Sequence, residues 1–305
     1  MSVTSTVRTV LGDIRPGELG VCDAHDHLFL RSPQLPGQEL DDLSSARAEL
    51  TAFRAAGGDA VVQWTPYGMG RRTADLPGLS RATGVHLVCA TGLHQAAHYA
   101  PESLDRLNGS LAELFVTELT EGIGGSGVRA GLIKVAGGFH GLDAHARRTM
   151  TAAAEAHHAT GAPIAVHLEL GTGALDVLDL LCGESGVPGH RVILGHLNRS
   201  PDPVVQRQAA ESGCWLAFDG PSRAHHATDW RMPEAVLALA EAGYGDRLLL
   251  GGDTVIAGAR SVDGGPGMSY LLRRVRPRLA EALGAELVHR ILGEHPGQAF
   301  AVDWT

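Results

Sequence analysis

The sequence alternates between short apolar runs that suit strands and longer stretches with apolar residues at helical spacing, and it does so eight times. The expected strands are Val21–Ala24, Ala60–Trp64, Val85–Ala90, Ala130–Val135, Pro163–Val166, Arg191–Leu194, Trp215–Phe218 and Arg247–Leu250. The expected helices are Ser44–Ala56, Leu76–Thr83, Leu104–Glu121, Ala144–Thr160, Ala174–Cys182, Pro203–Ser212, Pro233–Ala242 and Met268–Leu283. This number and order are typical of a (β/α)8 TIM barrel of the α/β class, which usually takes about 250 residues.

Two segments flank the repeat. Val7–Gly20 is expected to form a short N-terminal hairpin, because Pro16-Gly17 interrupts it. The tail Glu286–Thr305 is expected to supply a C-terminal closing helix and a capping segment. Since we find no convincing domain boundary, we expect residues 1–305 to form a single domain.

The main structural alternative is a doubly wound open sheet, in which parallel strands also alternate with helices. That fold normally has a glycine-rich phosphate-binding turn after its first strand. Here the first strand runs into histidines instead, in the stretch Val21–Leu30 (VCDAHDHLFL). The barrel is therefore our prediction.

Composition narrows the class of function. The formal net charge of −9 argues against a nucleic-acid partner, which needs a basic surface. No apolar run approaches the roughly 20 residues of a membrane helix, and the first residues do not resemble a secretory signal. The widely separated cysteines suit buried reduced thiols, so we expect a cytoplasmic protein. With nucleic acid and membrane excluded as partners, we expect a small-molecule substrate.

Residue types that bind metal follow several of the expected strands. His25 and His27 follow the first, and side chains at i and i+2 of a strand point to the same side. Lys134 lies in the fourth strand, and the fifth, sixth and eighth end at His167, His196 and Asp253. In a barrel these positions meet at the C-terminal mouth, where catalytic groups of this fold lie.

Each of these residues alone also suits a structural role. A histidine after a strand can be a hydrogen-bonded rim residue, Asp253 can cap a helix, and Lys134 can pair with a carboxylate. A lysine inside an apolar strand is nevertheless costly unless its charge is held or removed. Because all of them are expected at one edge, the set predicts a metal site.

These residues and motifs resemble the phosphotriesterase family of the amidohydrolase superfamily. The resemblance is carried by His25-Asp26-His27, by Lys134 in RAGLIKVA, by His167, by His196 in ILGH and by Asp253. Similarity also extends through VVQWTPYGMGR and GVHLVCATG, and it covers nearly the whole chain. The family commonly has glutamate between the first two histidines, where this chain has Asp26.

The resemblance implies a centre with two divalent metal ions. His25, His27 and Asp253 would bind one ion, His167 and His196 the other, and Lys134, carboxylated on its amine, would bridge both. Such ligands suit zinc, with cobalt, manganese or iron as alternatives. A hydroxide bridging the ions would be the nucleophile, and Asp253 would accept the attacking proton.

The family analogy also suggests the substrate class, a lactone or small carboxylic ester. An organophosphate triester and an N-acyl amide stay open, because the same ligands suit attack at carbon and at phosphorus. A non-catalytic metal-containing binding protein is an alternative of another class. A mononuclear amidohydrolase such as a deaminase is a third, although such enzymes lack the bridging lysine.

Loop residues at the expected mouth are the candidates for substrate contacts. They are His94, which stands where lactonases of the family often have tyrosine, and Arg223 and Arg260, either of which could bind an anionic group. Gly220 stands where many relatives have a larger polar residue. The oligomeric state stays open, with a homodimer as one option.

Overall fold

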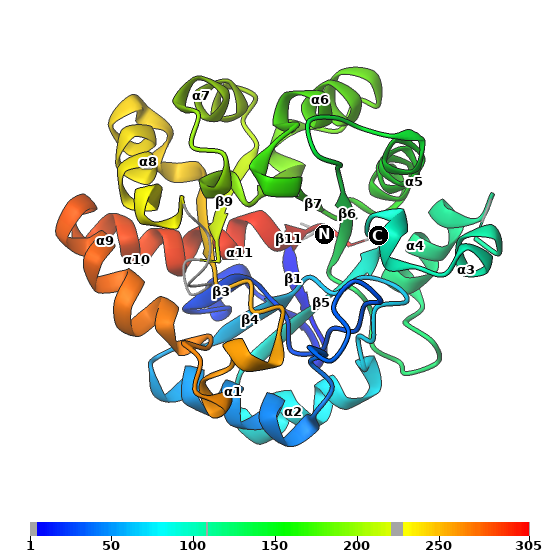
Figure 1. Ribbon diagram of the computed structural model, residues 1–305, viewed down its shortest axis with the longest axis horizontal. Helices are drawn as coiled ribbons and strands as arrows, with labels where there is room; N and C mark the ends of the chain where they lie inside the picture. Colours follow the sequence, from blue (N-terminus) through cyan, green and yellow to red (C-terminus); the bar gives the residue numbers. More distant parts are fainter. Residues whose placement is uncertain (1–4, 108, 221–227, 305) are drawn as a thin grey trace.

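The computed structural model of the protein describes residues 5–107, 109–220 and 228–304, and its centre is a barrel of eight parallel strands in chain order (Figure 1). The strands are β3 (Cys22–Asp26), β4 (Ala60–Gln63), β5 (His86–Gly92), β6 (Leu132–Ala136), β7 (Ile164–His167), β8 (Val192–Gly195), β9 (Trp215–Asp219) and β10 (Leu248–Gly251). Each overlaps a strand predicted from the sequence. The predicted TIM barrel is confirmed, and the apolar runs that revealed it are those of strands buried on both faces.

Helices surround the barrel (Figure 1). They are α1 (Leu43–Ala55), α2 (Leu76–Thr83), α3 (Pro101–Asp105), α4 (Leu111–Thr120), α5 (Ala144–Thr160), α6 (Ala174–Leu178), α7 (Pro203–Glu211), α8 (Met232–Leu239) and α9 (Arg276–Leu283). The prediction of one helix over Leu104–Glu121 is wrong. The first helix ends at Asp105 and the second begins at Leu111. Gly109 between them has a left-handed conformation with φ of 84°, which an unbroken helix could not contain.

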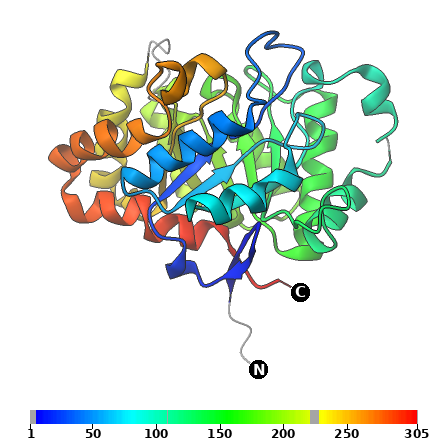
Figure 2. The ribbon, with the colours of Figure 1, turned by 90° about the horizontal axis from the view of Figure 1, so that it is seen from below.

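The two ends of the chain close the bottom of the barrel. The predicted hairpin consists of β1 (Thr6–Thr9) and β2 (Gly12–Ile14), and β11 (Ala301–Val302) pairs with β1 as a third strand. Figure 2 shows both chain ends there, with the segment that follows β3 projecting at the opposite end. The tail holds two helices, α10 (Ala285–Leu292) and α11 (Glu294–Phe300), where the sequence suggested one.

The barrel interior is filled mainly by small side chains and tryptophan. A buried hydrophobic cluster in the interior includes Ala24, Ala90, Ala165 and Trp64. The Trp64 indole donates to the carbonyl of Ala24 (2.8 Å) and stacks on the ring of His25, with centroids 3.7 Å apart. This indole therefore forms a fixed support beneath the first histidine of the mouth.

No helix in the described part of the chain is both long and apolar enough to cross a membrane.

Candidate active site

A cavity of about 350 Å³ opens at the C-terminal ends of the barrel strands. Its wall includes five of the six expected metal ligands, namely His25, His27, Lys134, His167 and Asp253. The sixth, His196, lies beside them, with its Nε2 2.8 Å from Nδ1 of His167. The structure thus brings together side chains from five different strands or strand ends.

His25, His27 and Asp253 form a compact group on the β3/β10 half of the mouth. Oδ1 of Asp253 lies 3.6 Å from Nε2 of His25 and 3.5 Å from Nε2 of His27. Zinc binds nitrogen and oxygen at about 2.0–2.2 Å, so two ligands of a tetrahedral ion lie ~3.4 Å apart. These two distances are close to those between ligands of one divalent ion.

His167 and His196 face each other on the β7/β8 half of the mouth. Nδ1 of the first and Nε2 of the second are 2.8 Å apart, which is a hydrogen-bond distance. A shared ion would require the two nitrogens to separate by about 0.6 Å. This pair fits a metal ion after a small side-chain adjustment.

The outer nitrogens of two imidazoles share one carboxylate. Asp219, the last residue of β9, accepts from Nδ1 of His25 at Oδ2 (2.8 Å) and from Nδ1 of His196 at Oδ1 (2.5 Å). Although burial alone would raise it, the facing imidazoles of His196 and His25 lower the pKa of Asp219 well below its ordinary value. The carboxylate thus fixes the orientation of both rings and directs each Nε2 toward the mouth.

The other two imidazoles have partners of their own. Thr65 Oγ1 donates its hydrogen to the carbonyl of Phe29 (2.6 Å), so it must accept from Nδ1 of His27 (2.8 Å). Nε2 of His167 donates to Glu169 Oε2 (3.0 Å), and this hydrogen bond lowers the pKa of Glu169 to about 2. An acceptor on the far side of a metal-binding histidine is the usual support for such a ligand.

Burial keeps the imidazoles of His27 and His167 neutral at neutral pH. It lowers the pKa of His27 to about 4 and that of His167 to about 3. Neutral imidazole is the form that binds a metal ion. The protonation states of the site therefore suit the ligand role at neutral pH.

Lys134 is buried on β6, with 3% of its surface exposed. Burial lowers the pKa of its amine from 10.5 to about 7, so a large fraction of the amine is neutral at physiological pH.

The partner of Lys134 across the sheet is Gly92, where a Cβ would lie 1.9 Å from the Lys134 carbonyl oxygen. Only glycine allows β5 and β6 to approach so closely at this level.

Two buried carboxylates join the first and last strands of the barrel. The amide of Gly252 donates to Asp23 (3.0 Å), and the amide of Thr254 donates to Asp26 (2.9 Å). The amide of Asp253 donates to the carbonyl of His25 (2.9 Å). This seam holds Asp253 in register with the histidines of β3.

His94 lies on the cavity wall, where sequence reasoning expected a substrate contact. Its ring stacks on that of His98, with centroids 4.3 Å apart, and is edge-on to His167 at 4.7 Å. Its buried Nδ1 has no hydrogen-bond partner among the described residues. His94 therefore has a ring nitrogen available for a ligand.

The two arginines expected to contact substrate have different outcomes. Arg260 is 2% exposed and is absent from the cavity wall. It donates to the backbone carbonyls of Leu28 and Asp42, so its guanidinium is committed to holding loops together, and the expected substrate contact is not supported. Arg223 lies outside the described residues.

Sequence reasoning missed three charged side chains of the site. Asp219 is the last residue of β9, at the same barrel level as the expected ligands. Listing the residues that end each expected strand could therefore have found it. Glu169 follows His167 by two residues and lies on the cavity wall, as does Arg199, which forms an ion pair with Asp253. Both depend on tight turns after β7 and β8 that no local pattern indicates.

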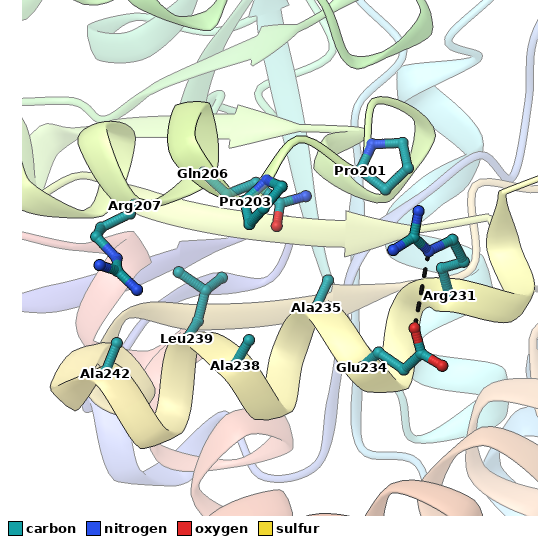
Figure 3. Close-up of a pocket in the computed structure, with 10 residues that line it drawn as sticks. All are labelled: Pro201, Pro203, Gln206, Arg207, Arg231, Glu234, Ala235, Ala238, Leu239 and Ala242. Carbon is teal, nitrogen blue, oxygen red and sulfur yellow. Dashed lines mark ion pairs between the residues drawn. The ribbon is translucent and has the colours of Figure 1, made fainter.

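A smaller hollow of about 190 Å³ lies between α7 and α8, on the outside of the barrel (Figure 3). Its charged residues include Arg231 and Glu234, which form an ion pair with Nε and Oε2 3.7 Å apart. Among the described residues of its lining there is no histidine. The mouth of the barrel is therefore the candidate active site.

Comparisons with known proteins find similarity over nearly the whole chain. The family model described as Phosphotriesterase family matches residues 5–300. The chain is 28% identical to the phospho-furanose lactonase of Mycoplasmopsis synoviae, covering 97% of this chain and 92% of that protein. It is 27% identical to the N-acetyltaurine hydrolase of Rattus norvegicus, covering 97% and 98%.

Among solved structures, the fold is similar to the lactonase Lmo2620 from Listeria monocytogenes. The TM-score is 0.92 at 28% sequence identity, and the match covers 97% of this chain and 99% of that one. The similarity therefore includes the whole barrel and its mouth.

Proposed function

The chain belongs to the phosphotriesterase family, and on that premise we propose that it is a hydrolase with two divalent metal ions, preferably zinc, acting on a lactone or small carboxylic ester. That it is a metal-dependent hydrolase follows from its family, its named relatives and its groups of buried histidine and aspartate. The number of ions, the metal and the substrate are the proposal.

One observation carries it. Four imidazoles bind a partner through one ring nitrogen. The other nitrogens of His25 and His27 face Oδ1 of Asp253, and those of His167 and His196 face each other. A set of histidines that only stabilised the fold would have no reason to share this orientation. Asp253 and Lys134 lie in the wall of the cavity.

In this proposal the ligands fall into two groups. His25, His27 and Asp253 would hold one ion, and His167 and His196 the other. Lys134 would bridge the groups after its neutral amine takes up carbon dioxide, because the carbamate product is an anion with two oxygens. Its pKa of about 7 supports this reaction, since only an unprotonated amine can perform it.

Bound ions of this kind would lower the pKa of a water molecule, so that hydroxide is available as the nucleophile at neutral pH. They would also polarise the substrate's acyl oxygen. The protein supplies proton handling and orientation. We assign proton acceptance to the carboxylate of Asp253, which lies within the site at 3.5–3.6 Å from two imidazoles. His94 would hydrogen-bond a substrate oxygen through its available nitrogen.

The lining of the cavity supports a small acyl substrate with an apolar part. Besides the expected ligands, its wall includes the apolar side chains Leu30, Leu35, Pro66, Met69 and Val255. Two of the similar proteins described above are named lactonases. The ester or lactone bond is therefore the first choice.

A second candidate is an N-acyl amide. It is favoured by the similarity to the protein named N-acetyltaurine hydrolase, which acts on an amide by its name. Attack on an amide needs the same ligands but a better protonated leaving amine. The two candidates therefore differ in proton delivery and not in the metal site.

We also propose that the protein works in a reducing compartment such as the cytoplasm. The four cysteines are free thiols, and three of them are buried. A chain that matured in an oxidising compartment would more often use them as disulfides.

The test is a metal analysis followed by a hydrolysis screen. Protein loaded with zinc or cobalt is expected to hold two ions per chain and to hydrolyse at least one compound from a panel of lactones, esters, N-acyl amides and phosphotriesters. Two ions without turnover of any compound would favour a non-catalytic binding protein. One ion per chain with unmodified Lys134 would favour a mononuclear enzyme.

A further inference from the structure

Arg199 reaches the metal site from the turn that follows β8. His196 has a left-handed backbone with φ of 66°, and the three residues after it form a single turn of 3-10 helix, Leu197–Arg199. Asn198 fastens this turn to β9, because its side chain accepts from the amide of Asp219 (3.0 Å) and donates to the Asp219 carbonyl (2.9 Å). One short turn therefore positions both His196 and Arg199.

The guanidinium of Arg199 lies against the carboxylate of Asp253. Its Nη2 donates to Oδ2 of Asp253 and lies 3.8 Å from Oδ1 of Asp219. The other oxygen of Asp253, Oδ1, is the atom that faces His25 and His27. The two oxygens of Asp253 thus have different nearest neighbours: Oδ2 accepts from the guanidinium of Arg199, with Nδ1 of His196 3.8 Å away, and Oδ1 faces His25 and His27.

A contribution to fold stability alone does not explain why the guanidinium of Arg199 is buried here. Its side chain is only 5% exposed, and its buried Nε has no hydrogen-bond partner among the described residues. A buried guanidinium with an unpaired N–H is costly. Arg71, by contrast, is equally enclosed but forms two hydrogen bonds of 2.7 Å with Glu118, as a structural ion pair does.

We propose that Arg199 is a positioning residue that withholds Oδ2 of Asp253 from the metal, so that this carboxylate can act only as a one-oxygen ligand. The inference rests on the proposed metal site. Catalytic metal sites keep a coordination position open for water or substrate, whereas structural sites are closed. A carboxylate with both oxygens free could occupy that position itself.

The proposal makes an unusual prediction about metal affinity. Removing Arg199 takes its hydrogen bond away from Oδ2 of Asp253 and also removes a positive charge that repels the ion. Both changes favour tighter binding. A residue that merely stabilised the site would do the opposite, because its loss would disorder the ligands and weaken binding.

The experiment uses Co²⁺ alone as the probe, with the full-length protein freed of metal by a chelator. Arg199→Met removes the charge at similar length, and Arg199→Lys keeps the charge but not the fork. Arg71→Met is the matched control, since it breaks a buried arginine–carboxylate pair outside the cavity wall. Affinity is measured by chelator competition, and coordination by the intensity of the visible Co²⁺ absorption.

For Arg199→Met we expect the first Co²⁺ to bind about 10-fold more tightly, with a weaker visible absorption because the coordination number rises. Arg199→Lys should lie between this variant and the wild type. Arg71→Met should lower the melting temperature and leave both metal readouts unchanged. If Arg199→Met fails to fold, Arg199→Lys must still show the shift in the same direction.

Weaker or unchanged Co²⁺ binding in folded Arg199 variants would overturn the positioning role. That result differs from a failure of the proposed function, because the wild type would then still bind two ions. A wild type that bound no Co²⁺ would instead refute the metal site and this inference together.

Discussion

The two halves of the barrel mouth differ in the spacing of their expected ligand atoms. In the β3/β10 half, the expected ligand atoms are 3.5 and 3.6 Å apart, which already matches a bound ion. In the β7/β8 half, the nitrogens of His167 and His196 are at 2.8 Å and must separate. The comparison teaches that similar side chains lie at metal-ligand spacing in one half, whereas those in the other half would have to adjust to bind the proposed second ion.

The difference has a physical cause in what lies behind each half. His25 rests on Trp64, and the seam carboxylates hold β3 against β10. The outer nitrogen of His167 is held by Glu169, which is partly exposed and belongs to a loop on the cavity wall. We therefore expect the β3/β10 half to bind the first ion.

The largest effect should come from removing the residue that would join the halves. We expect Lys134→Ala to lose both ions and to lower turnover by about 10⁴-fold or more, because neither half keeps its bridging ligand. Metal analysis and the rate on any substrate from the screen measure this. Added short carboxylic acids should restore part of both, and full activity in the unaided variant would rule out the bridge.

The next effect concerns the β3/β10 half alone. We expect Asp253→Asn to lower turnover by about 10²–10³-fold while KM changes much less, because the amide cannot accept a proton. Steady-state kinetics of the metal-loaded variant measure the two constants separately. An unchanged turnover number would remove the proton role of Asp253.

The shared carboxylate tests whether the halves are coupled. Asp219→Asn should weaken both ions by about 10- to 100-fold, because Asp219 orients one histidine in each half. Stepwise cobalt titration distinguishes the two binding events. Weakening of only one ion would show that the halves are independent at this residue.

Glu169→Gln should give a smaller effect, limited to the β7/β8 half. The neutral amide still accepts from His167 but lacks the charge, so we expect the second ion to bind about 10-fold more weakly and the first to be unaffected. The same cobalt titration reports both. Equal weakening of the two ions would contradict the division of the mouth into separate halves.

The smallest effect is the pH dependence of the metal-free protein. The folded pKa values of His27 and His167, about 4 and 3, lie below the ordinary value of 6.5. The unfolded chain therefore binds more protons between these limits, and the free energy of unfolding should fall as the pH drops from about 6.5 toward 4. Urea unfolding at pH 7.5 and pH 5 measures it, and equal stability at both would show that the rings are not desolvated.

How much the sequence could predict depends on whether a feature is periodic. Buried parallel strands appear in the sequence as continuous apolar runs, so the barrel could be predicted. The position of His25, His167 and Asp253 at the C-terminal ends of strands could be predicted for the same reason. The split of the helix near Gly109 could not, because one left-handed residue outweighs an unbroken apolar spacing.

The rest of the site depends on contacts between distant segments. Arg199 meets Asp253 across 54 residues, and nothing near either residue in the chain indicates the pair. Arg260 shows the reverse error, since its place in a loop suggested a ligand contact and tertiary packing buried it. Position along a strand was readable from the sequence, but the course of a loop was not.

The seam between β3 and β10 gives the metal a mechanical part to play. An ion held by His25, His27 and Asp253 would bridge the earliest and latest strands of the cylinder, at the place where side chains replace a regular ladder of amide bonds. It would act as a clasp on a rolled sheet. Chelation should then loosen the cylinder along this line first, and the amide hydrogens of Gly252, Asp253 and Thr254 should exchange with solvent before those of β6 and β7.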